Sequence, residues 1–261
     1  MNYTKNLQFW DERAKLGDLA GSNDFGIKNF EMDTLNEYIE DGMKILDIGC
    51  GSGTSAFYFA SNKNIDITGL DFSPQMIEQA KLDLKNKNFD NKKMRFFVED
   101  IKNISDSTNI SGEQYDIVMT ERVIINLSSW DEQRKAIIDI MEYVKPGGCY
   151  LMCENLQEGL ENLNSLRKKF NLETIDKPWH NRYLTKDEMS SIDEVNVEDC
   201  IDFSSTYYFF SRIINAELAS REGRQPSYDS PINDLALSLK NHVDLSALDI
   251  GQTRLWVIKK N

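Results

Sequence analysis

The chain has 261 residues, of which 40% are hydrophobic and 28% are charged, and its formal net charge is -13 at pH 7. This length fits one large α/β domain with insertions. No segment is apolar over the roughly 20 residues that a membrane-spanning helix needs, and residues 1–10 lack the apolar run of a secretory signal. The acidic balance repels phosphate polymers and anionic lipid. We therefore expect a cytoplasmic protein with no nucleic-acid partner and no membrane insertion.

The four cysteines predict no cross-link. Cys50, Cys149, Cys153 and Cys200 lie in apolar or glycine-rich surroundings. They lack the paired spacing that is typical of a disulfide framework or a zinc knuckle. We therefore expect reduced thiols.

The N-terminal segment predicts two peripheral helices. Apolar residues recur among charged ones in Asn6–Leu16, which favours an amphipathic helix. Residues 17–28 are rich in Gly, Asp, Asn and Ser and predict a loop. The second helix is expected over Asn29–Glu40.

Strands and helices then alternate along the chain. Ser73 and Pro74 are typical of the N-cap and first residue of a helix that runs towards Lys85. Such alternation is typical of a parallel sheet with helices on both faces. The expected strands are 44–48, 66–70, 94–98, 115–120, 149–153, 197–203 and 253–259, and the helices between the first five are 54–60, 74–85 and 130–144.

Two long segments after residue 155 interrupt this alternation. Roughly 45 residues separate the fifth strand from the sixth, and about as many separate the sixth from the seventh, which is more than simple connections need. Helices are expected in these segments over 156–170, 186–192, 207–219 and 232–242. Both insertions are candidates for a lid over the sheet.

A glycine cluster stands where the first strand meets the next helix. In ILDIGCGSG, residues 45–53, the glycines at 49, 51 and 53 permit positive φ angles and close approach of a ligand to the backbone. The amides at the start of the helix suit an anionic group. A tight turn without any ligand is the alternative.

Acidic residues follow the neighbouring strands. Asp71 ends the second strand, where a carboxylate can accept both hydroxyls of a ribose, and Asp100 follows the third. A dinucleotide-binding loop would place its third glycine at position 54, where this chain has Thr54. The pattern therefore predicts a nucleoside-containing ligand and disfavours NAD.

Together, ILDIGCGSG, Asp71, Asp100 and the sequence KPGG at 145–148 resemble the class I S-adenosylmethionine-dependent methyltransferases. The likeness covers residues 30–155 well and the insertions hardly at all. It implies an α/β fold with a Rossmann-like, doubly wound, mostly parallel seven-stranded sheet and helical lid insertions. It also implies S-adenosyl-L-methionine as cofactor and S-adenosyl-L-homocysteine as product.

The resemblance also divides the chain into three parts of one structural domain. Residues 1–155 would hold the N-terminal cap helices and the cofactor-binding core, and residues 156–195 the first lid insertion. Residues 196–261 would hold the last two strands, with a helical insertion over about 205–248.

At the methionine end of the cofactor, the resemblance implies that Gly49, Gly51 and the Cys50 backbone line the site. Asp47 would organise the loop, and Gly53 completes the glycine set.

At the nucleoside end, Asp71 would bind the ribose hydroxyls, and Phe72 would flank the adenine. Asp100 would accept from the exocyclic amine, and the Ile101 backbone would meet a ring nitrogen. Phe72 and Ile101 have the alternative of being core residues, and Asp100 that of a helix cap.

The acceptor is expected beside the end of the fourth strand, at Glu121 and Arg122, where the family places residues that face the sulfonium and the acceptor. No Asn-Pro-Pro-Tyr or Asp-Pro-Pro-Tyr run, which is typical of enzymes that methylate bases in nucleic acids, follows this strand. Glu154–Asn155 offers only one carboxylate and one amide to Mg²⁺, so we expect no metal.

Residues 178–183 form the second acceptor candidate. We assign Trp179, Tyr183 and Asn155 to substrate binding and His180, Arg182 and Arg122 to catalysis. The arginines would hold an anionic group through their bidentate fork. The alternative is that the aromatic residues pack the lid while His180 and Arg182 are solvated.

These residues predict a methyltransferase for a small-molecule or sugar- or phosphate-linked acceptor, in bacterial surface-polysaccharide or secondary metabolism. We rank O-methylation ahead of N-methylation on a small amine or amino sugar. A nucleoside-binding α/β protein without methyl transfer is the alternative of another class.

Overall fold

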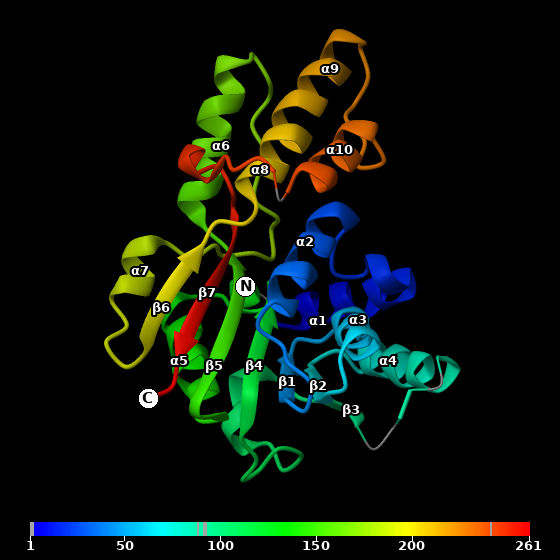
Figure 1. The fold of residues 1–261 in the computed structure, drawn as a ribbon, viewed down its shortest axis with the longest axis vertical. Coiled ribbons are helices and arrows are strands. Elements are labelled where there is room, and N and C mark those ends of the chain that lie inside the picture. The colour runs from blue at the N-terminus through cyan, green and yellow to red at the C-terminus, as the bar shows by residue number, and fades with distance from the viewer. Residues whose placement is uncertain (1–2, 88, 91–92, 241) are drawn as a thin grey trace.

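A computed structural model describes residues 3–87, 89–90, 93–240 and 242–261. They form one seven-stranded sheet in the order β3-β2-β1-β4-β5-β7-β6 (Figure 1). The first five strands are parallel, and β7 runs antiparallel to both β5 and β6. This is the expected mostly parallel, doubly wound sheet. The strands are β1 (Lys44–Ile48), β2 (Asp66–Asp71), β3 (Met94–Val98), β4 (Tyr115–Glu121), β5 (Val144–Asn155), β6 (Asn196–Ile201) and β7 (Thr253–Lys259).

Helices cover both faces of the sheet. None of those in the described part of the chain is long and apolar enough to span a bilayer. The helices are α1 (Tyr3–Arg13), α2 (Phe25–Asn36), α3 (Thr54–Asn62), α4 (Pro74–Asn86), α5 (Trp130–Met141), α6 (Gln157–Lys169), α7 (Lys186–Ser190), α8 (Ser205–Tyr208), α9 (Asn215–Arg221) and α10 (Pro231–Leu239). Shorter helical turns are η1 (Ala14–Leu19), η2 (Ile101–Asp106), η3 (Ile124–Asn126), η4 (Phe209–Ile214) and η5 (Ser246–Leu248).

The core consists of two layers because successive strand residues point to opposite faces. Leu46 belongs to the layer that contains Ile137 of α5. Its neighbour Ile45 belongs to the layer that contains Leu35 of α2 and Phe59 of α3. The central strands β1 and β4 are therefore largely buried on both sides, as parallel strands usually are.

The two insertions form one helical lobe at an end of the sheet, where α6, α9 and α10 stand together (Figure 1). Leu163 of α6, Tyr207 of α8 and Ala236 of α10 share a buried cluster with Ile27 and Phe30 of α2. The lobe is thus joined to the N-terminal segment, and α2 lies between it and the sheet.

Three local expectations differ from the structure. The segment 17–28, expected as a loop, contains η1 and the start of α2, because Asp24 accepts a hydrogen bond from the Ile27 amide and begins the helix there. The helix expected over 207–219 contains the π-helix η4. The Lys-Pro-Gly-Gly sequence at 145–148, which predicts a turn before the fifth strand, lies within β5.

Substituting Gly159→Ala tests how α6 is held against the segment before β7. A Cβ at position 159 would overlap the Gly251 carbonyl and lie 2.8 Å from the Gln252 Cα, so backbone must shift. Alanine favours a helix by about 1 kcal/mol over glycine, but overpacking costs about 1–3 kcal/mol. We expect a net loss in chemical denaturation. Ser165→Ala on the exposed face of α6 is the control, and equal stability of both variants would contradict the packing argument.

Candidate functional site

A cavity of about 420 Å³ opens at the carboxyl edge of the parallel strands. Asp71, Glu121 and Asn155 are the last residues of β2, β4 and β5, and all three line it. Further lining comes from the glycine loop, from α1 and α2, from residues 178–183 and from the helical lobe. The cavity therefore has two sides. We call them the sheet side, at the strand ends, and the insertion side, beneath the insertions.

The glycine loop has the backbone conformation that its sequence predicts. Gly49 and Gly51 both line the cavity with positive φ, 74° and 54°. A Cβ at Gly49 would overlap Val123, so only glycine fits there. The amides of Gly49 and Cys50 donate to the Leu70 carbonyl, which ties the loop to the end of β2.

Asp71 fits a ribose site. Its Oδ2 accepts from the Gly51 amide and its Oδ1 from the Ser73 amide, both at 2.9 Å. Each carboxylate oxygen has a second lone pair for a ligand hydroxyl. Burial raises the pKa of Asp71 to about 6, although both amide hydrogen bonds oppose the shift. The group is therefore a strong acceptor only near or above neutral pH.

The expected adenine residues surround a smaller cavity of about 50 Å³. Phe72 and Asp100 line it together with Tyr3 of α1. Tyr3 meets the Phe72 ring edge-on at 6.2 Å and hydrogen-bonds Asp100, which also caps η2 through the Lys102 amide. Ile101 packs against the core and does not line either of these cavities.

Asp47 and Gly53 support the loop from behind and do not line the large cavity. Asp47 is 1% exposed, and no described residue hydrogen-bonds its Oδ2. Burial first, and then Glu121, raise its pKa well above the ordinary value. Gly53 is the N-cap of α3, and a Cβ there would press on Phe57 and Phe96.

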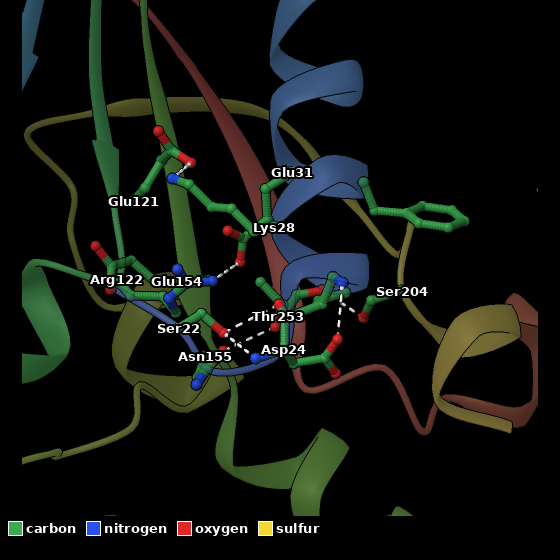
Figure 2. Close-up of polar contacts among 12 residues, drawn as sticks. Ser22, Asp24, Lys28, Glu31, Glu121, Arg122, Glu154, Asn155, Ser204 and Thr253 are labelled. Carbon is green, nitrogen blue, oxygen red and sulfur yellow. Dashed lines mark hydrogen bonds and ion pairs between the residues drawn. The ribbon is translucent and has the colours of Figure 1, made fainter. Parts of the chain in front are cut away.

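Two buried ion pairs join α2 to the end of β4 (Figure 2). Lys28 Nζ lies 2.6 Å from Glu121 Oε2 and also donates to Ser55 Oγ. Arg122 pairs with Glu31, which is fully buried. Burial alone would lower the pKa of Arg122, but Glu31 and Glu121 raise it above its ordinary value. Arg122, expected as an anion holder, therefore already has a carboxylate partner.

His180 lies on the insertion side of the cavity among aromatic rings. Its ring centroid is 4.5 Å from that of Phe9 and 5.5 Å from that of Trp10, both on α1. Burial, and then the nearby Arg13, lower the pKa of His180 to about 4. The imidazole is therefore neutral at physiological pH.

Tyr183 and Asn155 line the cavity, whereas Arg182 and Trp179, which the sequence assigns to the same acceptor site, do not. Arg182 pairs with Glu188 of α7 and donates to Gln133 Oε1 of α5 at 2.6 Å. Its charge therefore holds residues 178–183 against these two helices. Trp179 is 48% exposed and packs outside the cavity, on Phe9 and His180. Adjacent residues in an irregular segment point to different sides, and the sequence could not order them.

Sequence reasoning missed several cavity residues on the insertion side. Arg212 projects from η4 and pairs with Asp24 at 2.5 Å, and Tyr207 donates to the same carboxylate. A π-helix shifts the helical register, which is a recurrent feature of functional sites. Sequence reasoning also missed the cavity residues Lys28, Asn126, Tyr228, Gln252 and Thr253.

Cys50 borders the cavity, and burial raises the pKa of its thiol well above the ordinary value, so the thiol stays protonated. All four cysteines are free. Within the described ranges, no group of three or more His, Cys, Asp or Glu side chains could hold a metal ion.

Removing Glu31 tests the ion pair to Arg122. Glu31→Leu leaves a largely buried guanidinium without its main partner, and such a change costs about 3 kcal/mol or more. The double variant Glu31→Leu with Arg122→Met removes both charges and should recover most of that loss. Chemical denaturation of the wild type and both variants completes the comparison. A double variant no more stable than Glu31→Leu would show that the charge is not the cause.

The geometry agrees with comparisons to known proteins. Residues 39–194 match a family model described as methyltransferase domain. Carboxy-S-adenosyl-L-methionine synthase from Nautilia profundicola is 28% identical over 143 residues, which are 53% of this chain and 55% of that protein. Demethylmenaquinone methyltransferase from Leptospira interrogans is 29% identical over 125 residues, 48% of this chain and 47% of that protein. The chain thus spans about half the length of these curated relatives.

Solved structures share the fold. The cyclase SpnF superposes with a TM-score of 0.57 at 19% identity, covering 88% of this chain and 80% of SpnF. The N-methyltransferase NodS from Bradyrhizobium japonicum, in complex with S-adenosyl-L-homocysteine, gives 0.53 at 18% identity, with coverages of 75% and 89%. The family model covers more than half of the chain. The chain therefore belongs to the class I S-adenosylmethionine-dependent methyltransferases, and S-adenosylmethionine is its cofactor.

Proposed function

We propose that this protein transfers a methyl group from S-adenosylmethionine to a hydroxyl of an uncharged small molecule. The observation that carries the proposal is the composition of the cavity beneath the insertions. Among the described residues, three arginines line the cavity. Arg122 is paired with Glu31 and Arg212 with Asp24, while Arg13 donates to the backbone carbonyls of Leu19 and Ala20. The histidine is neutral. An anionic acceptor would have to compete with two buried carboxylates, so a neutral one is favoured.

The bound cofactor supplies an electrophilic methyl group, and the chain has to supply a positioned nucleophile and exclude water. Phe9 and Trp10 close over the cavity from α1, and Tyr183 and Tyr208 close it from the insertions. A sugar or alcohol hydroxyl also has to lose a proton. His180 is the histidine in this cavity, and its neutral ring can accept one.

The chemical setting of the acceptor also remains part of this proposal. A sugar-linked acceptor, in surface-polysaccharide or secondary metabolism, agrees with a neutral, hydrogen-bonding cavity. A small amine that binds in its uncharged form is the second candidate, because its nitrogen is already a nucleophile and needs no base before methyl transfer.

The variant Asp71→Asn tests the cofactor site. An amide replaces a charged acceptor, and hydrogen bonds to charged groups contribute roughly 1.5–3 kcal/mol each, so binding should weaken about tenfold to a hundredfold. Calorimetric titration with S-adenosylhomocysteine measures this. Asp66→Asn, at the exposed start of the same strand, is the control. Affinity equal to that of the wild type would remove Asp71 from the ribose site.

His180→Ala tests the proton acceptor. General-base catalysis contributes on the order of 10²–10⁴ in rate, so turnover should fall by that amount while S-adenosylhomocysteine affinity is unchanged. Since the folded-state pKa of His180 is about 4, below its ordinary value, the wild-type rate should not fall through protonation of this group between about pH 8 and pH 5. Methyl transfer from labelled cofactor gives both readouts. Wild-type turnover in His180→Ala would exclude the role.

A further inference from the structure

On the insertion side of the cavity, the hydrogen-bond donors and acceptors of the side chains point to a particular ligand chemistry. We infer that the acceptor is a polyhydroxylated neutral compound of the sugar type, recognised by Gln252, Asn181 and Tyr183. This inference rests on the proposed function and names its substrate class. It depends on two hydrogen-bonded chains whose donors and acceptors can be assigned in order.

The first chain runs from Asn155 to Gln252. Thr253 Oγ1 donates to Asn155 Oδ1 at 2.9 Å (Figure 2). Since this uses the threonine proton, the contact of 3.1 Å between Tyr208 Oη and Thr253 Oγ1 requires the tyrosine to donate. The Tyr208 hydroxyl has then spent its proton and can only accept from Gln252, with which it also hydrogen-bonds. The amide nitrogen of Gln252 must therefore face Tyr208.

This leaves the Gln252 Oε1 as a free acceptor. Gln252 is 8% exposed and lines the cavity, and no described residue donates to its Oε1. A buried acceptor without a partner costs free energy, so such groups usually have one. A ligand hydroxyl in the cavity is a suitable partner because it can donate.

The second chain ends at Tyr183. The side-chain amides of Asn155 and Asn181 both hydrogen-bond its hydroxyl. Asn155 uses its oxygen for Thr253, so it reaches Tyr183 with its nitrogen and occupies a lone pair there. No described residue donates to the Asn181 Oδ1, in agreement with Asn181 also turning its nitrogen to the tyrosine. With both lone pairs taken, the Tyr183 O–H is left to donate, and burial raises its pKa to about 12, which keeps the proton in place.

Asn126 is a third side-chain amide whose nitrogen donates a hydrogen bond and whose oxygen accepts none within the described part of the chain. Asn126 Nδ2 donates to the Arg122 carbonyl at 2.6 Å, and no described residue donates to its Oδ1. Asn126 also lines the cavity. Three amide oxygens, from three separate segments of the chain, thus lack donors among the described residues around the large cavity, and Asn126 also lines the smaller cavity beside Phe72 and Asp100.

A hydroxyl-rich ligand satisfies these groups together. A carboxylate or phosphate accepts but cannot donate to the amide oxygens, and an ammonium donates but cannot accept from Tyr183. A hydroxyl does both. Several hydroxyls on one rigid ring can reach acceptors and a donor at different places, which is the arrangement of a pyranose.

The test uses the full-length protein saturated with S-adenosylhomocysteine and saturation-transfer NMR. The neutral probes are the methyl glycosides of glucose, galactose, mannose and rhamnose, and the charged comparators are glucuronate and ethanolamine. We expect a neutral glycoside to bind. Its dissociation constant should rise about three- to tenfold in Gln252→Leu and in Asn181→Leu, the effect of losing one or two neutral hydrogen bonds. Gln114→Leu, at an exposed glutamine, is the control and should not change it.

Tyr208→Phe is the second variant, in case Gln252→Leu folds poorly. Tyr208 is a positioning residue here, so its loss should weaken glycoside binding while S-adenosylhomocysteine affinity and melting temperature stay near those of the wild type. Binding of glucuronate or ethanolamine but of no neutral glycoside would overturn the inference, as would equal glycoside binding by Gln252→Leu and Gln114→Leu. Failure of the wild type to bind S-adenosylhomocysteine would instead reject the proposed function.

Discussion

The site depends on the pairing of α2 with the end of β4. Lys28 and Glu31 lie one helical turn apart and reach Glu121 and Arg122, which are neighbours in sequence (Figure 2). The Arg122 backbone has a φ of 58°, an uncommon angle for a residue with a side chain, and this conformation presents both side chains to the helix. Because α2 also packs against the helical lobe, these two ion pairs fix the distance between the sheet edge and the insertions.

A buried carboxylate holds the neighbouring loop in the same way. Glu154 accepts from the amides of Val123 and Ile124, and more weakly from Ile125, so it caps η3 and orients the residues that follow β4. Burial raises the pKa of Glu154 to about 7 in spite of these bonds. A residue that looked like half of a metal site is therefore used to position backbone.

Charge is used differently on the two sides of the cavity. On the sheet side, the buried Asp71 accepts from two backbone amides, which suits a ligand that brings hydroxyls. On the insertion side, Arg122 and Arg212 each have a carboxylate partner, and the neutral polar groups are amides, hydroxyls and the His180 imidazole. Under the proposed function, this division would separate recognition of the cofactor from recognition of the acceptor. The aromatic contacts of α1 with residues 179–180 lie over the insertion side.

The sequence by itself determined the cofactor half. A strand, a glycine loop and an acid at the next strand end are local patterns, and parallel strands bring their carboxyl ends to one edge whatever the rest of the chain does. Only the tertiary structure decided the acceptor half. The cavity is lined by Asp24, Arg212 and Gln252, which lie far apart in the sequence. Packing brings Asp24 beside Arg212 and Glu188 beside Arg182. Arg212 therefore lines the cavity and Arg182 does not. No local pattern carries that information, because an ion pair forms between whichever charges the fold places in contact.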